Sequence, residues 1–295
     1  MTPAVETAGL GKRYGNRWAL SDCTLSIPPA RVVGLVGPNG AGKTTLLSLA
    51  VGLLSPTSGS INVLGAEPAS TARQMSRVGF VAQDTPLYSN LSIADHLQLG
   101  AHLNPGWDNH LAQGRLERLD LDLGQPAGSL SGGQRAQVAL TLAIAKHPEL
   151  LILDEPVARL DPLARREFLQ VLMETVAEEQ VSVVLSSHLV ADLERVCDYL
   201  VVLVASLVQV DGEIEKLRAS HFRLTGPRRD PGSLPKNQRV IEASHTDRQT
   251  TLLVCTEEPI LDPAWTVEPI RLEDLVLAYM RQAREARTAP LLRQS

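Results

Sequence analysis

The sequence is poor in cysteine. Its 295 residues include only Cys23, Cys197 and Cys255, and no two of them form a C-x-x-C pair. A disulfide-stabilised scaffold and a cysteine zinc site are therefore both disfavoured, and the composition fits a reducing cytosol. We interpret all three residues as buried structural thiols.

Long apolar runs are also missing. The longest, Tyr199–Val208, spans ten residues, whereas a membrane-spanning helix needs roughly 20. The first residues, MTPAVETAGL, contain neither the basic region nor the long apolar region of a secretory signal. We expect a chain that does not cross a membrane by itself.

Dense blocks of basic charge are absent as well. The chain has 28 basic and 33 acidic residues, a net charge of −5. This balance gives no reason to expect a nucleic-acid partner. The apolar content of 44% supports a substantial core, and the length suits one large domain with or without an appendage.

The stretch Val32–Thr45 carries the strongest signal that is present. Val32–Val36 is apolar and mostly β-branched, as a strand buried on both faces should be. Residues 46–51 are typical of a buried helix. Between them, residues 37–44 match the phosphate-loop pattern G-x-x-x-x-G-K-[ST]. The alternative is a glycine-rich turn with a surface lysine, but the strand before and the helix after favour the phosphate loop.

The residue types of this loop suit a triphosphate. Gly37, Gly40 and Gly42 let the backbone turn tightly and bring its N–H groups close to phosphate oxygens. The helix that starts near Lys43 adds the positive end of its dipole. The Lys43 ammonium can reach the β- and γ-phosphates, and the Thr44 hydroxyl can ligate Mg²⁺.

A second polar segment, Ser129–Gln134, precedes an apolar helix. Ser131 can cap that helix, and the glycines Gly132 and Gly133 leave backbone N–H groups open to an anion. An ordinary loop and helix cap is the alternative reading of this segment on its own.

Two adjacent carboxylates end the apolar strand within Glu149–Pro156. Asp154 is placed to hold Mg²⁺, directly or through water. Glu155 is then within reach of a water beside the γ-phosphate and can act as a general base. Adjacent carboxylates after a buried strand have little structural purpose, which favours the catalytic interpretation.

Three single residues allow two readings each. Tyr14, in the turn KRYGN, either stacks on a purine ring or packs at the turn. Asp161 either is a functional group or is the N-cap of the helix that starts at Pro162. His188, at the end of the strand Val181–Leu185, either donates a hydrogen bond to a γ-phosphate or merely begins the next helix.

The coarse pattern predicts an α/β core with additions. Strands are expected at 5–10 and 17–27, and a helical subdomain is expected at about 84–147, with helices at Leu91–Leu103 and Leu111–Leu123. Beyond about residue 220 the pattern indicates a loop at Gly226–Gly232, then two strands. A final helix presents Leu272, Leu275, Val276, Tyr279 and Met280 on one face. We interpret this helix as packing on a small α+β appendage, with partner docking as the alternative, and residues 288–295 as a disordered tail.

The order of the motifs resembles the nucleotide-binding domain of an ABC ATPase over about residues 4–217. The matching pieces are GPNGAGKTT, Gln83, LSGGQ, LILDEP, the Leu160-Asp161 loop and His188. The resemblance implies a P-loop NTPase core of ABC type, with an antiparallel β subdomain and an inserted helical signature subdomain. The implied boundaries are 1–219 for this domain and 220–287 for the C-terminal accessory α+β region.

The resemblance also implies roles for single residues. Glu155 matches the catalytic base, His188 the switch histidine, and Gln83 the residue that senses Mg²⁺ and the attacking water. The Mg²⁺ ligands are then Thr44, Gln83 and Asp154. The implied ATP contacts are Tyr14, Gly37, Pro38, Asn39, Gly40, Ala41, Gly42, Lys43, Thr44, Thr45, Ser131, Gly132, Gly133, Gln134 and Asp161, of which Ser131–Gln134 would reach the nucleotide of an opposite subunit. One residue departs from the pattern: Ala158 stands where the family usually has Ser or Gly before x-Leu-Asp.

The implied function is the ATP-hydrolysing subunit of an ABC transporter at the cytoplasmic face of the cell membrane. Its partners would be a second copy of the chain, or a related ABC subunit, and a separate transmembrane permease that docks in a groove along Thr85–Ile93. Leu87, Tyr88 and Leu91 are the apolar residues of this stretch, and they either line the groove or pack into the helical subdomain. Residues 91–100, LSIADHLQLG, together with the short helical region, look most like ATPases that export drugs, antibiotics or lipid-like compounds. The alternatives are a soluble ABC ATPase that acts on the ribosome or DNA, and a nucleotide-binding regulator without useful turnover, against which Glu155 and His188 argue.

Overall fold

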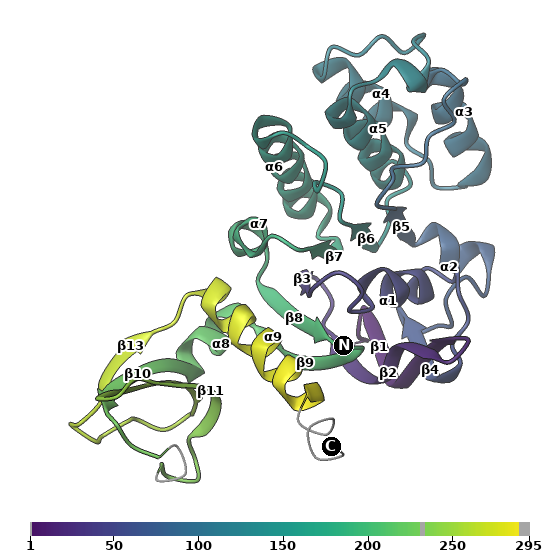
Figure 1. The fold of residues 1–295 in the computed structure, drawn as a ribbon. Helices are drawn as coiled ribbons and strands as arrows, with labels where there is room; N and C mark the ends of the chain where they lie inside the picture. Colours follow the sequence, from purple (N-terminus) through teal and green to yellow (C-terminus); the bar gives the residue numbers. More distant parts are fainter. Residues whose placement is uncertain (1, 231–233, 289–295) are drawn as a thin grey trace.

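The centre of the molecule is a six-stranded sheet in the order β5-β6-β7-β3-β8-β9 (Figure 1). The computed structural model describes residues 2–230 and 234–288. The strands are β3 (Val32–Val36), β5 (Val78–Val81), β6 (Leu150–Asp154), β7 (Ser182–Ser187), β8 (Tyr199–Val204) and β9 (Leu207–Glu213). Neighbouring strands from β5 to β8 are parallel, and β9 is antiparallel to β8. The predicted α/β core is confirmed.

A three-stranded antiparallel sheet lies beside α1 (Lys43–Ala50) on one side of the central sheet (Figure 1). It consists of β1 (Val5–Tyr14), β2 (Arg17–Ile27) and β4 (Ser58–Val63). Leucine, isoleucine and valine side chains of both sheets and of α1 form one buried cluster. Cys23 belongs to this cluster, and burial raises the pKa of its thiol to about 11. Cys197 and Cys255 are free and only partly buried, so full burial was predicted correctly for Cys23 alone.

The helical subdomain contains α3 (Ile93–Leu103), α4 (Asn109–Arg118), a 3₁₀ turn (Ala127–Ser129) and α5 (Gly132–Ile144), which share a small apolar core. The short α2 (Ala72–Ser76) precedes it. Two predicted helix boundaries were wrong. Ser92 forms a capping box that starts α3 after Leu91, and α4 ends before Leu123 because Asp120 adopts a left-handed backbone conformation with φ 52°. Apolar spacing continues across both points, so it cannot locate them.

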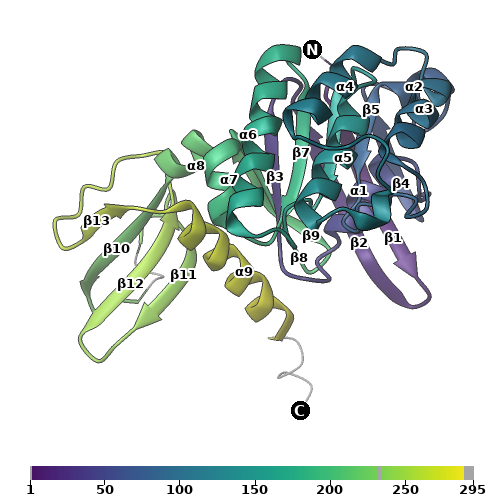
Figure 2. The same cartoon turned by 90° about the horizontal axis from the view of Figure 1, so that it is seen from above.

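The C-terminal region forms a four-stranded antiparallel sheet in the order β11-β12-β10-β13 (Figure 2). Its elements are α8 (Ile214–Ser220), β10 (His221–Pro227), β11 (Arg239–His245), β12 (Gln249–Cys255), β13 (Thr266–Pro269) and α9 (Leu272–Thr288). The predicted loop at Gly226–Gly232 was wrong for its first two residues, which end β10; part of that range lies outside the described residues. Thr288 was predicted to be disordered but ends α9, and residues 289–295 of the predicted tail lie outside the described residues.

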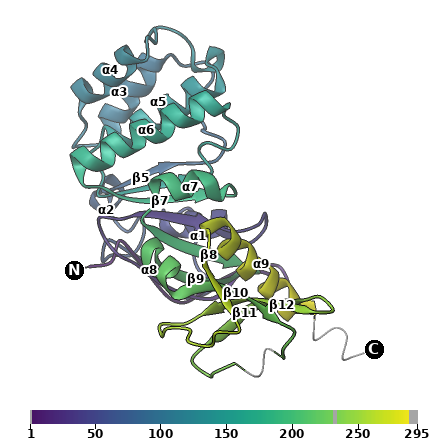
Figure 3. The same cartoon turned by 90° about the vertical axis from the view of Figure 1, so that its left-hand side faces the viewer.

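Helix α9 does not pack only on its own sheet. It contacts β11 but also α7 (Val190–Val196), β8 and β9. Leu272, Leu275 and Val276 of α9 belong to the same buried cluster as Leu193 of α7, and α6 (Pro162–Glu179) contributes to it as well. The prediction that this helix packs on a separate appendage was therefore incomplete, because one apolar stripe does not reveal which elements cover it. Figure 3 shows α9 beside β8, with the helical subdomain at the top and the C-terminal sheet at the bottom.

Candidate functional site

The phosphate loop lies between β3 and α1, as the sequence predicts. Gly42 precedes α1 with φ 110°, a conformation that side chains disfavour, and a Cβ there would lie 2.4 Å from the Ala19 carbonyl oxygen. No side chain caps α1. The first backbone N–H groups of α1 are therefore available to an anion, with the helix dipole behind them.

A cavity of about 540 Å³ opens in front of this loop. Besides the loop, Tyr14 at the end of β1, Gln83 after β5, and Glu155 after β6 line it. The sequence-predicted site residues that line it are Tyr14, Asn39, Gly40, Ala41, Gly42, Lys43, Thr44, Thr45, Gln83 and Glu155. Segments far apart in the sequence thus meet at one cavity whose size suits a nucleotide.

Gly37 and Pro38 do not line the cavity. The reason for a glycine at position 37 is packing, since a Cβ there would lie 2.1 Å from the Leu203 carbonyl oxygen. Arg17, which does line the cavity, was missed by the sequence analysis. Its only sequence signal was its place three residues after Tyr14, too weak to single out one exposed arginine.

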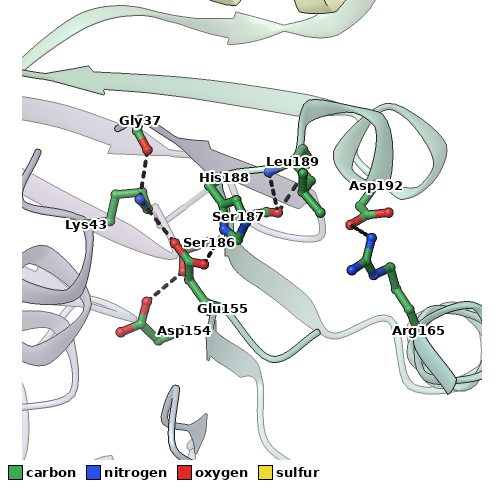
Figure 4. A network of polar contacts seen from close by, with 10 residues as sticks. All are labelled: Gly37, Lys43, Asp154, Glu155, Arg165, Ser186, Ser187, His188, Leu189 and Asp192. Atoms are coloured by element: carbon green, nitrogen blue, oxygen red, sulfur yellow. Dashed lines mark hydrogen bonds and ion pairs between the residues drawn. The ribbon is translucent and has the colours of Figure 1, made fainter. Parts of the chain in front are cut away.

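Lys43, Glu155 and His188 form a chain of polar contacts (Figure 4). Lys43 Nζ donates a hydrogen bond to the Gly37 carbonyl oxygen at 2.8 Å and lies 3.2 Å from Glu155 Oε1. The other Glu155 oxygen, Oε2, lies 2.6 Å from His188 Nδ1. The His188 ring thus contacts the predicted catalytic carboxylate, and helix α7 begins two residues later, at Val190.

Glu155 is also held through its backbone. Its φ is 47°, unusual for a residue other than glycine, and such conformations persist where surrounding contacts fix them. The Ser186 hydroxyl on β7 accepts a hydrogen bond from the Glu155 N–H at 2.8 Å and donates one to Asp154 Oδ1 at 2.7 Å. Ser186 is fully buried. It is a second residue that the sequence analysis did not identify.

The oxygen donors at this edge of the sheet fit Mg²⁺. The described residues donate no hydrogen bond to Asp154 Oδ2, and the hydroxyl-bearing Thr44 lines the same cavity as Gln83. Within the described residues, no group of three His, Cys, Asp or Glu side chains could hold a metal by itself. A single carboxylate with a hydroxyl and substrate phosphates is a usual arrangement for Mg²⁺.

The residues Ser131–Gln134 are not brought to the cavity of about 540 Å³. Ser131 caps α5: its Oγ accepts from the Gln134 N–H, and the Gln134 side chain accepts from the Ser131 N–H. Gly132 lines a neighbouring cavity of about 310 Å³ together with Gln83 and Glu155. Within one chain, the predicted signature residues therefore do not share a cavity with the phosphate loop.

Asp161 is the N-cap of α6, one of its two predicted readings. Its Oδ1 accepts hydrogen bonds from the N–H groups of Leu163 and Ala164, both at 3.0 Å, and Pro162 occupies the first helical position. It does not line the cavity in front of the phosphate loop. Its predicted ATP contact receives no support from the single chain.

An apolar groove of about 560 Å³ lies between β5 and helices α3 and α5. Leu87 and Tyr88 line it, as predicted, but Leu91 does not. Tyr88 is 69% exposed, whereas Leu87 also packs against the core of the helical subdomain. Leu99, Leu103 and Trp107 are among the other apolar residues that line it.

Comparison with known proteins identifies the family. The family model for the ABC transporter matches residues 20–158. The chain is 33% identical over 201 residues to the thiamine import ATP-binding protein ThiQ of Shigella flexneri serotype 5b (strain 8401), covering 66% of this chain and 86% of ThiQ. The chain belongs to the family of ABC transporter ATP-binding proteins.

Two other relatives of this ABC protein have different named roles. It is 34% identical over 240 residues to the phosphonates import ATP-binding protein PhnC 2 of Pseudomonas syringae pv. syringae (strain B728a), and the match covers 74% of this chain and 87% of PhnC 2. It is 31% identical over 198 residues to the lantibiotic transport ATP-binding protein SrtF of Streptococcus pyogenes, and the match covers 65% of this chain and 82% of SrtF. The narrower prediction of a drug-export type is thus not confirmed.

Solved structures agree with the fold of this ABC protein. An ATP-binding subunit of an ABC transporter has a TM-score of 0.65 at 29% identity, covering 73% of this chain and 92% of that one. A dimeric bacterial ABC transporter cassette, MJ0796, has a TM-score of 0.64 at 23% identity, covering 71% and 98%. The predicted P-loop core of ABC type is confirmed, and the chain is an ATPase of this family. Within the described residues, no helix is both long and apolar enough to span a bilayer.

Proposed function

We propose that the chain binds ATP in the cavity of about 540 Å³ in front of the phosphate loop and hydrolyses it to drive a transporter. The contact of Glu155 with both Lys43 and His188 carries this proposal. The N–H groups of residues 43–45 would bind the phosphates, and Tyr14, exposed at the cavity rim, would stack on the adenine. Thr44, Gln83 and Asp154 would hold Mg²⁺, which neutralises phosphate charge when bound.

Hydrolysis then follows from the position of one carboxylate. Once Lys43 turns to the phosphates, Glu155 Oε1 becomes free to accept a proton from the attacking water. His188 keeps its contact with Oε2 and thereby fixes the direction of the free oxygen. The buried surroundings of Glu155 limit competing water and strengthen these charged contacts.

A second copy of the chain, or a related ABC subunit, completes the site. Ser131 and Gly132 are exposed and lie outside the phosphate-loop cavity of their own chain. The Ser131 hydroxyl and the Gly132 N–H at the start of α5 can meet the γ-phosphate bound by an opposite subunit. A solved cassette of the same fold is dimeric, which supports the pairing of two subunits. We also assign Asp161 to the interface between the two subunits, because it does not line the phosphate-loop cavity of its own chain.

A transmembrane permease is the proposed receiver of the work. The groove of about 560 Å³ is largely apolar, with no acidic residue among those that line it, and Tyr88 and Leu103 are strongly exposed there. Exposed apolar surface of this kind suits a short amphipathic helix of a membrane protein. ThiQ and PhnC 2 are import ATP-binding proteins by name, and we place this chain at the cytoplasmic face of the membrane, beside the permease.

Export is our proposal for the direction of transport. It is based on residues 91–100 and on the similarity to SrtF, whose name refers to lantibiotic transport. Import remains the competing direction because ThiQ and PhnC 2 are import proteins by name. Uptake and efflux of candidate compounds in cells with and without active chain would distinguish the two directions.

A photo-crosslinker at position 88 tests the transporter assignment. In whole cells we expect a product with a membrane protein, and the same crosslinker at exposed Leu261, far from the groove, should not give it. Purified chain carrying Tyr88→Ala should keep its ATP affinity, because no phosphate ligand is touched, and should lose the membrane protein on co-purification. Products with ribosomal proteins or DNA alone would instead support the soluble class of ABC ATPase.

A further inference from the structure

A second ionic contact lies beside the catalytic network without reaching the nucleotide cavity. Arg165 Nη1 lies 3.6 Å from Asp192 Oδ2, and the two side chains are 25% and 11% exposed (Figure 4). Arg165 Nε and Asp192 Oδ2 are buried, and neither has a hydrogen-bond partner among the described residues. Burying two charges without full hydrogen bonding costs free energy, so stability alone does not explain the pair.

Each partner is anchored next to a residue of the proposed site. Arg165 lies in the first turn of α6, and its Nη2 donates a long hydrogen bond, 3.5 Å, to the carbonyl oxygen of Leu160 in the turn that follows Glu155. Asp192 lies in the first turn of α7, which begins two residues after His188. The pair therefore joins the two connections that leave the adjacent parallel strands β6 and β7.

These two connections also carry the contact between Glu155 Oε2 and His188 Nδ1 at 2.6 Å. At the strand ends, Asp154 is paired with Ser186 in the sheet, and the Ser186 hydroxyl bridges to Asp154 and to the Glu155 N–H. The β6–β7 pairing thus holds the strand ends before Glu155 and His188 together. The Arg165–Asp192 ion pair joins the segments that follow Glu155 and His188.

We propose that Arg165 and Asp192 are positioning residues that hold the turn after Glu155 and helix α7 together, and so keep His188 against Glu155 during hydrolysis. This inference rests on the proposed catalytic role of Glu155. Neither residue lines the nucleotide cavity, so their effect is on the chemical step rather than on ATP binding.

Other contacts of α7 do not replace the pair. Glu194 of α7 is paired with Arg218 of α8, but this contact does not join α7 to the turn after Glu155. Helix α7 has seven residues and no side-chain cap. Leu193 packs in the buried cluster with α9, but apolar packing is non-directional and fixes distance better than orientation. The ion pair specifies which side of α7 faces α6.

The test compares neutral variants of the full chain. Arg165→Gln and Asp192→Asn keep size and remove charge. We expect kcat for ATP to fall about tenfold or more in each, because small displacements of a catalytic contact are costly, while the Kd for ATP stays within about twofold. The kcat of the double neutral variant should be no lower than that of either single variant. The charge-swapped variant Arg165→Glu/Asp192→Lys should have a higher kcat than the neutral variants.

A matched ion pair provides the control. Arg77 and Glu149 form an ion pair just before the first residues of β5 and β6, at the end of the sheet opposite to Glu155. Arg77→Gln or Glu149→Gln should leave kcat unchanged. If both neutral variants at 165 and 192 keep wild-type kcat, or if kcat falls only together with ATP affinity and melting temperature, the positioning role is overturned. Glu155→Gln separates the two hypotheses: wild-type kcat in that variant overturns the proposed function itself, whereas an inactive Glu155→Gln with fully active pair variants overturns only this inference.

Discussion

Lys43 Nζ lies 3.2 Å from Glu155 Oε1, and each side chain is only 6% exposed. The proposed phosphate ligand and the proposed general base are thus bound to each other. A nucleotide that enters the cavity competes with Glu155 for the Lys43 ammonium, and it releases the carboxylate when it succeeds. The same contact that neutralises two buried charges would couple phosphate binding to activation of the base.

Glu155→Gln should therefore bind nucleotide more tightly than wild type, even without metal. The amide no longer competes for Lys43, so we expect the Kd for ADP in EDTA to fall about tenfold, which corresponds to about 1.4 kcal/mol. Titration calorimetry measures this. Using ADP keeps both hydrolysis and a bridging γ-phosphate out of the comparison.

Asp154→Asn is the control for that titration. It removes one negative charge at the same strand end without touching Lys43, so it should tighten ADP binding much less. Equal tightening in both variants would mean that general electrostatics, rather than the Lys43–Glu155 contact, governs the affinity.

Lys43→Ala should reduce ATPase activity roughly a hundredfold or more, since a fixed phosphate charge loses its partner. It should also destabilise the fold by about 3 kcal/mol, because Glu155 is left as a buried, poorly compensated carboxylate. Adding Glu155→Gln should restore most of the stability but none of the activity. Melting curves check the predicted stabilities, and steady-state turnover checks the predicted activities. Wild-type turnover in Lys43→Ala would contradict the assignment of the site.

Glu155→Gln should also bring two subunits together in Mg-ATP. The amide keeps the shape of the side chain and loses the proton acceptor, so turnover falls by about 100-fold or more and ATP stays bound. A trapped γ-phosphate can then contact Lys43 of one subunit and Ser131 of the other. Size-exclusion chromatography should show a dimer that disappears when Ser131→Arg is added. A monomer at saturating ATP and high protein concentration would count against the head-to-tail pair.

The sequence predicted the motifs better than the contacts among them. The phosphate loop, Asp154 and Glu155 were identifiable because their spacing from buried strands is short and local. The Glu155–His188 contact was not, because it depends on β6 and β7 being neighbours, and sequence order alone does not give strand order. Ser186 was missed for the same reason: a serine in an apolar strand shows no function until its neighbour is known.

Helix α9 illustrates a second limit. Its apolar stripe was predicted correctly, but its partner was assigned by proximity in sequence. In the structure, Leu275 and Val276 lie in one cluster with Leu193, which is some eighty positions earlier in the chain. Apolar burial is non-directional, so a stripe indicates burial but not what covers it.

Removal of residues 221–295 tests our proposed boundary at about residue 220. Every predicted nucleotide contact precedes it, so we expect ATP binding to persist. The loss of α9 exposes Leu193 and Leu200, and the fragment should melt at a clearly lower temperature than the full chain. Val276→Asp in the full chain is a milder variant that should lower the melting temperature in the same direction. A folded fragment that cannot bind ATP would show that the boundary is wrong.

The buried His221 makes the stability of the C-terminal region depend on pH. Its Nδ1 lies 2.7 Å from the Leu217 carbonyl oxygen, so that nitrogen carries the proton, and Nε2 accepts from the Tyr279 hydroxyl at 2.9 Å. Tyr279 in turn accepts from Arg239, and the Ser220 hydroxyl lies 3.1 Å from Nδ1. Burial lowers the pKa of His221, and the nearby Arg239 charge lowers it further, although the Leu217 hydrogen bond opposes them.

Because the folded-state pKa lies below the ordinary value of 6.5, the unfolded chain binds this proton more readily. The free energy of unfolding should therefore fall as pH drops from about 7.5 through the unfolded pKa, and should level off below the folded pKa. His221→Gln keeps a hydrogen-bonding side chain and cannot titrate, so the difference between wild type and variant in urea unfolding should shrink on acidification from pH 7.5 to pH 5.5. Other histidines contribute equally to both proteins; the pKa of His147, for example, is raised because hydrogen bonds to Glu179 and Asp108 together outweigh its burial. A difference that stays constant or grows on acidification would contradict a neutral, buried His221.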